Sequence, residues 1–113
     1  MRSAVLALGM IGAAHVCADS ETVTLGRQLA HSYEKGNCLG CHRIPGDPKA
    51  ITLATLGPPL VNMRERFPER ATLQAQLWDS TRSNPSTIMP PFGKHGVLTE
   101  QEIEQIIEYI YQY

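Results

Sequence analysis

Residues 36–42 read Gly-Asn-Cys-Leu-Gly-Cys-His, so Cys38 and Cys41 lie three positions apart and His42 follows at once. This pattern of two thiols and an imidazole restricts the function of a small chain more strongly than most five-residue motifs. A thioredoxin-like dithiol would lie in a βαβ unit, and no alternating strand pattern surrounds the motif. A disulfide between Cys38 and Cys41 would restrain little of the unfolded chain, because the loop that it closes is so short.

A structural zinc site needs four ligands, which usually come as two spaced pairs. The further candidates His31 and His95 do not form a second pair. The interpretation that fits best is one covalently bound haem c. In it, Cys38 and Cys41 form thioether bonds with the cofactor, and His42 is the proximal iron ligand.

The second axial ligand has four candidates in the sequence, namely Met63, Met89, His31 and His95. Met63 falls in a helical pattern, where packing in the core is the usual role of methionine. Two prolines follow Met89 and stiffen its loop, so the thioether can be held in place at a low cost in entropy. We therefore expect His42 and Met89 to be the metal ligands.

A metal-bound imidazole usually donates its other ring N–H to a carbonyl or a carboxylate. The turn Gly57-Pro58-Pro59-Leu60 is stiff enough to present such a carbonyl, and Pro58 is the candidate for supporting His42. The alternative is that these prolines only shape a turn.

The first eighteen residues have the order of a secretory signal peptide. Met1-Arg2-Ser3 is positively charged, residues 4–14 are apolar and uncharged, and Val16-Cys17-Ala18 resembles a small-x-small cleavage site. The apolar run is shorter than the ~20 residues that a membrane span needs. We expect a signal peptide over residues 1–18, a mature domain over residues 19–113 and a periplasmic location. A buried N-terminal helix and a lipid anchor at Cys17 are the alternatives.

The chain has 113 residues and a net charge of −1, which is the size of one small domain. Removal of residues 1–18 would leave nine Lys and Arg against eleven Asp and Glu, so no basic patch for nucleic acid is indicated. With two Phe and one Trp, the core is poor in large side chains, and a cofactor would supply stability that it lacks.

The pattern after residue 19 predicts an all-α fold. Thr24 is the expected N-cap of a first helix that runs to about Lys35, and Gly36 is its expected left-handed terminator. Two leucines share one face of this helix and two small residues beside them would allow close approach of another helix, namely Leu25 and Leu29, and Gly26 and Ala30.

Two further helices are expected over residues 61–67 and 68–79, and residues 43–60 and 80–98 have loop composition. The last helix follows a capping box of Thr99 and Glu102. Four isoleucines then mark its buried face, namely Ile103, Ile106, Ile107 and Ile110. We expect three to five helices, with long loops wrapped around one covalently attached haem.

These motifs together resemble class I cytochrome c, and more narrowly the SoxX family, the monohaem subunit of the SoxAX cytochrome of thiosulfate oxidation. Five stretches carry the resemblance, namely residues 36–42, Gly57-Pro58-Pro59-Leu60, Trp78-Asp79, the run Asn-Pro-Ser-Thr-Ile-Met-Pro-Pro-Phe-Gly over residues 84–93, and Leu98-Thr99-Glu100 with Glu102-Ile103. The run over residues 84–93 is the most specific of them.

The resemblance implies haem-linked cysteines at Cys38 and Cys41, a proximal ligand at His42 and a distal ligand at Met89. It implies a SoxA-like haem subunit as partner, in a complex that oxidatively joins thiosulfate to a cysteine of the SoxYZ carrier protein. The chemistry would occur at the SoxA haem with its cysteine ligand. This chain would pass the electrons to a further cytochrome, and we assign it no catalytic side chain.

Other functions and roles stay open at this point. A free electron shuttle is the alternative function, and a ligand-sensing haem protein would require an easily vacated iron site. Arg64, Arg66 and Arg70 could pair with haem propionates or a partner, or form a solvated helix face. Trp78 could lie against the haem edge or pack in the core.

Overall fold

The computed structural model describes residues 19–113, and the expected signal peptide and Cys17 lie outside this range. Its helices are α1 (Ser20–His31), α2 (Met63–Arg66), α3 (Arg70–Trp78) and α4 (Glu100–Ile110), with short 3₁₀ turns η1 (Cys38–Gly40) and η2 (Ser80–Arg82). Residues 19–113 contain no β-strand, so the all-α prediction is confirmed. None of the helices described here has the length and hydropathy to cross a bilayer.

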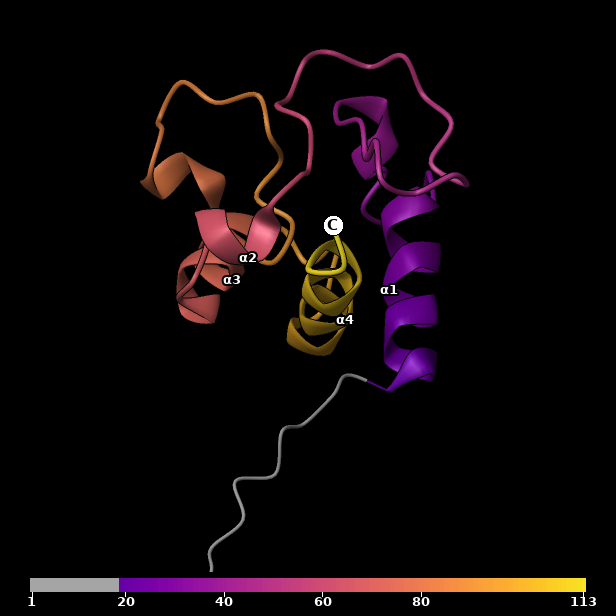
Figure 1. Ribbon diagram of the computed structural model, residues 1–113. Coiled ribbons are helices and arrows are strands. Elements are labelled where there is room, and N and C mark those ends of the chain that lie inside the picture. Colours follow the sequence, from indigo (N-terminus) through magenta and orange to yellow (C-terminus); the bar gives the residue numbers. More distant parts are fainter. Residues whose placement is uncertain (1–18) are drawn as a thin grey trace, which may run out of the picture.

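Helix α4 is the centre of the fold. It packs between α1 on one side and α3 on the other (Figure 1). The four isoleucines of its predicted apolar face are all buried, which confirms the periodicity. The capping box is also confirmed, since the Thr99 hydroxyl accepts from the Glu102 amide and the Glu102 carboxylate accepts from the Thr99 amide.

Small residues allow α1 and α4 to cross closely. A Cβ atom on Gly26 would lie 1.9 Å from the carbonyl oxygen of Gln105, so the two helix backbones could not lie this close together with any larger residue at position 26. Ala30, one turn later, is completely buried. The expectation that these small residues admit a neighbouring helix is therefore confirmed.

The predicted limits of α1 were wrong, and of the two leucines on its predicted apolar face Leu29 packs against the core whereas Leu25 does not. Its N-cap is Asp19, whose carboxylate accepts a hydrogen bond of 2.8 Å from the Thr22 amide, and the helix ends at His31. Leu25 is 37% exposed, because the close crossing with α4 uses the glycine and alanine face instead. A cap five residues upstream satisfies the first amide groups equally well, and the sequence alone does not separate the two.

The prediction that Gly36 is the left-handed residue after α1 was also wrong. The left-handed residue is Asn37, with φ of 46°, and the φ of Gly36 is not positive. Gly36 is buried, and a Cβ there would lie 3.1 Å from both the Leu29 carbonyl oxygen and the Cys38 sulfur. Space, rather than backbone conformation, favours glycine at the entry to the Cys-x-x-Cys-His motif.

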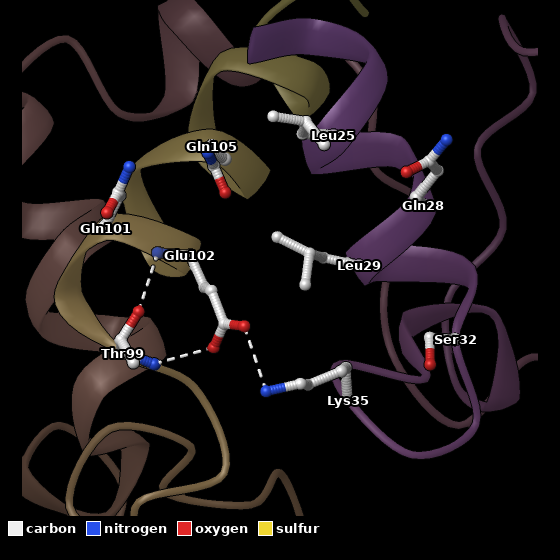
Figure 2. A pocket seen from close by; sticks show the side chains of 9 residues that line it. All are labelled: Leu25, Gln28, Leu29, Ser32, Lys35, Thr99, Gln101, Glu102 and Gln105. Carbon is white, nitrogen blue, oxygen red and sulfur yellow. Dashed lines mark hydrogen bonds and ion pairs between the residues drawn. The ribbon is translucent and has the colours of Figure 1, made fainter.

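The two long loops, magenta over residues 43–60 and orange to yellow over residues 83–98, lie at the same end of the helices (Figure 1). The segment before the motif is tied to the start of α4 by an ion pair of 2.9 Å between Lys35 and Glu102. Figure 2 shows this pair beside the capping box, in a groove between α1 and α4. The pair helps to place the motif relative to the central helix.

Candidate functional site

A cavity of about 480 Å³ lies between the two loops and the helices α2, α3 and α4. Its walls are mostly apolar and include Leu60, Leu73, Leu77, Phe92, Ile106 and Ile110. All the residues predicted to bind the cofactor or its metal also line it, namely Cys38, Cys41, His42, Pro58 and Met89. Side chains that are up to 51 positions apart in the chain are thus brought to one cavity.

One wall of the cavity holds His42 in a fixed orientation. Its Nδ1 atom lies 2.7 Å from the carbonyl oxygen of Pro58, which can accept a hydrogen bond from the ring N–H. The ring lies against the backbone of Gly57, where a Cβ atom would come within 2.3 Å of the imidazole Cε1. With Nδ1 engaged, Nε2 is the nitrogen left to bind a metal.

The two cysteines flank η1 on the same wall. The amides of Cys41 and His42 both donate to the Cys38 carbonyl oxygen, at 3.1 and 2.8 Å, so the motif forms one compact turn. Both thiols are free. Burial raises the pKa of the Cys38 thiol to about 12, so this sulfur is protonated at neutral pH.

Met89 reaches the cavity from the second loop, and its backbone is fixed at two points. The Ser80 hydroxyl donates to the Met89 carbonyl oxygen at 2.7 Å. The Met89 amide donates to the Thr87 hydroxyl at 3.1 Å. Pro90 follows directly, so the position of the thioether is restricted from both directions.

The same loop is anchored beyond the prolines by Trp78 and Asp79. A Cβ atom on Gly93 would lie 2.0 Å from Trp78 Cε3, so the indole lies directly on the loop backbone. The Lys94 amide donates to the Trp78 carbonyl oxygen at 3.1 Å, and the Lys94 ammonium pairs with Asp79 at 3.4 Å. Trp78 is not among the residues that line the cavity, so its contact is with the loop and not with the cofactor space.

The geometry narrows the choice of the second axial ligand. His31 and His95 do not line the cavity, whereas Met63 and Met89 both do. Met63 is 2% exposed, as expected for core packing, and its sulfur lies 3.4 Å from an Arg66 nitrogen. Met89 as the iron ligand stays a prediction, with Met63 as its competitor.

The three arginines have different surroundings. Arg64 donates to the Tyr111 carbonyl oxygen, and Arg70 pairs with Glu104 and Glu108 on α4. Arg66 lines the cavity and donates to the carbonyl oxygens of residues 59 and 61. Of the three, Arg66 is the one placed to meet an anionic group of a cofactor.

The residues around the cavity fit haem c. The walls are apolar, two thiols and an imidazole share one wall, and the missing side chain of Gly57 leaves room for the ring of His42. Across residues 19–113, no three His, Cys, Asp or Glu side chains gather into a metal-binding cluster.

Sequence reasoning missed two groups of residues. The first is Gln76, whose side-chain amide nitrogen lies 3.8 Å from the Met89 sulfur. The second centres on Tyr109 of α4, whose hydroxyl donates a hydrogen bond of 2.5 Å to the Asp47 carboxylate in the first loop. His31 also contacts the Tyr109 hydroxyl, at 3.0 Å. These contacts depend on how the elements pack, so no local pattern in the sequence indicates them.

Comparison with known proteins places the chain in a family. Residues 24–110 match the family described as "Cytochrome C oxidase, cbb3-type, subunit III". An uncharacterized lipoprotein of Aquifex aeolicus (strain VF5) is 32% identical over 78 residues, which are 69% of this chain and 37% of that protein. The chain thus corresponds to little more than a third of the length of this relative.

The chain belongs to this family of c-type cytochrome domains, and its helical architecture is consistent with the class I cytochrome c fold. Membership implies covalently bound haem c and electron transfer through it. The expected fold is therefore confirmed, and so is the general class of function.

Proposed function

We propose that this chain is the monohaem electron-transfer subunit of a SoxAX-type complex. The complex would oxidatively couple thiosulfate to a cysteine of a SoxYZ-type carrier, as an L-cysteine S-thiosulfotransferase. The observation that carries the proposal is that Met89 lines the same cavity as Cys38, Cys41 and His42. Met89 belongs to the run over residues 84–93 that most specifically resembles SoxX.

In this reaction a bond forms between the carrier thiol sulfur and the outer sulfur of thiosulfate, one proton leaves the thiol, and two electrons are released. When bound, haem c supplies a one-electron ferric/ferrous couple. Cys38 and Cys41 would hold it through thioether bonds, His42 and Met89 would bind its iron, and the Pro58 carbonyl would orient His42. A His/Met pair gives a higher potential than two histidines, which suits an electron acceptor.

The apolar side chains at the cavity mouth fit this role. Leu56, Ile88 and Val97 line the cavity and are also at least 36% exposed. They would exclude water from most of the cofactor while keeping one edge close to the surface, where electrons can enter and leave.

We place the protein in the periplasm. Residues 1–18 have the signal-peptide pattern, and the Aquifex relative is a lipoprotein, which is an extracytoplasmic class of protein. Cleavage after Ala18 gives a soluble mature chain, whereas processing before Cys17 with acylation gives an anchored one. Intact mass of the protein from its native host distinguishes the two.

A free electron shuttle is the second candidate function. It is favoured by the family match, which concerns a general c-type cytochrome domain and not a thiosulfate-oxidising subunit. The two functions differ in whether a haem-containing partner stays bound and whether thiosulfate reduces this chain through it.

The test is purification of untagged protein from the native periplasm. We expect a second c-type cytochrome with cysteine ligation to co-elute, and thiosulfate to reduce this chain when partner and carrier protein are both present. The control omits the carrier. A lone monomer at every concentration, with no carrier-dependent reduction, would rule out the subunit function and leave the shuttle.

A further inference from the structure

Met89 is contacted at its side chain as well as at its backbone. The Gln76 side-chain amide nitrogen lies 3.8 Å from the Met89 sulfur, in position to donate a hydrogen bond to it. Gln76 comes from α3 and lines the cavity. The loop that carries Met89 is therefore linked to α3 through the sulfur that would bind the metal.

The Gln76 amide is itself oriented by a third residue. The Ser83 hydroxyl lies 2.7 Å from the Gln76 side-chain oxygen and 3.1 Å from the Ser80 carbonyl oxygen, and its one proton is directed to the nearer acceptor, Gln76. An amide has one accepting and one donating end, so this contact directs the NH₂ group away from Ser83 and toward Met89. Ser83 follows η2, whose Ser80 holds the Met89 carbonyl oxygen, and the four residues form one connected set.

We infer that Gln76 is a positioning residue for the Met89 thioether and that it raises the reduction potential of the bound haem. A thioether sulfur has two lone pairs, so it can accept a hydrogen bond and still bind iron. An N–H donor withdraws electron density from the sulfur and places a partial positive charge beside it. Both effects disfavour the ferric state, because it carries the larger positive charge. This inference rests on the proposed role of Met89 as the iron ligand.

Substitution of Gln76 by leucine removes the donor and keeps a side chain of similar size. If the substitution acted only by making the haem surroundings less polar, it would disfavour the charged ferric state and raise the reduction potential. If it acts by removing the hydrogen bond to Met89, it should lower the reduction potential. The sign of the change therefore separates the hydrogen bond from a general effect of polarity or packing.

The experiment compares the haem-loaded Gln76→Leu and Ser83→Ala variants with the wild type. Gln74→Leu is the matched control, because Gln74 lies on the same helix two positions earlier and does not line the cavity. The readouts are the reduction potential by redox titration and the near-infrared sulfur-to-iron charge-transfer band of the oxidised protein. Ser83 is exposed and lies outside the core, so its variant tests the network without disturbing the packing.

We expect a lower potential in Gln76→Leu, with the band retained and shifted to longer wavelength, because an unbonded sulfur gives up its electrons more easily. Ser83→Ala should shift both in the same direction by a smaller amount, and Gln74→Leu should match the wild type. If Gln76→Leu matches the Gln74→Leu control, or if its potential rises, Gln76 does not have this role and Met89 ligation is unaffected. If the wild type lacks the band, or Met89→Ala retains it, the ligand assignment itself is wrong.

Discussion

The Nδ1 atom of His42 lies 2.7 Å from the Pro58 carbonyl oxygen, while the Cε1 atom of the same imidazole lies against Gly57. One short turn therefore both orients the ring and leaves the space that the ring needs. This relationship makes the site sensitive to a single methyl group.

Gly57→Ala should destabilise the haem-loaded protein by about 1–3 kcal/mol, the usual cost of overpacking a filled site. The added Cβ would lie 2.3 Å from the His42 ring, so the ring or the turn must move. Denaturant unfolding followed by haem absorbance and circular dichroism measures the change. Gly40→Ala is the control, because its Cβ would meet only the exposed Asn37 side chain, at 3.1 Å. Equal stabilities of the two variants would contradict the close fit.

Covalent attachment should survive denaturation. We expect haem to remain on the chain after acid–acetone extraction, and Cys38→Ser to retain one thioether bond at most. Intact mass before and after extraction measures both. Release of all the pigment from the wild type would refute the haem c interpretation.

Met89→Ala should abolish the sulfur-to-iron band and lower the reduction potential, because a thioether favours the ferrous state more than water or nitrogen ligands do. Near-infrared absorption and redox titration measure these changes. Met63→Leu is the control, because both methionines line the cavity and this substitution conserves volume, at a cost usually under ~1.5 kcal/mol. A band lost with Met63 and kept without Met89 would assign the ligand to α2.

Asp47 should contribute to stability at neutral pH and lose that contribution in acid. Burial alone would raise the pKa of Asp47, but the Tyr109 hydroxyl, the Lys49 amide and the charges of His31 and Arg27 hold it below its usual value. A carboxylate with a depressed pKa in the folded state stabilises the protein above its unfolded pKa of about 3.9, and the effect disappears as the pH falls through the folded value.

Asp47→Asn should therefore be less stable than the wild type at pH 7, by about 1.5–3 kcal/mol for a hydrogen bond to a charged group. The difference should shrink below about pH 4. Urea unfolding between pH 7 and pH 3 provides the measurement. Glu34→Gln, at an exposed position, serves as the control. A difference that is constant with pH would show that the Asp47 charge does not contribute.

The sequence predicted the parts of the fold that local patterns determine. Helix α4 has both a capping box and an apolar face of isoleucines, and it was predicted from its first residue onward. The start of α1 was not, because Asp19 and Thr24 are both acceptable caps. The left-handed residue is Asn37 and not Gly36, and the space around Gly36 is limited by Leu29 and Cys38, which are brought there by packing.

The site likewise has residues that local patterns predict and contacts that they do not. The fixed spacing of Cys38, Cys41 and His42 identified the cofactor locally, and a stiff turn made Pro58 a reasonable acceptor. The contact of Gln76 with Met89 and that of Asp47 with Tyr109 join residues 13 and 62 positions apart. Such pairs follow from the packing of the two long loops on α3 and α4, which no short stretch of sequence specifies.

The pairing of α1 with α4 also sets an order of events as the chain is made. Synthesis proceeds from the N-terminus, and α1 emerges long before residues 100–110, against which Gly26 and Ala30 are buried. Contacts between such distant segments form late, because the loop that separates them must first be closed. During this interval Cys38 and Cys41 are not yet enclosed by the later elements. We therefore expect both thiols to stay accessible until helix α4 packs against α1.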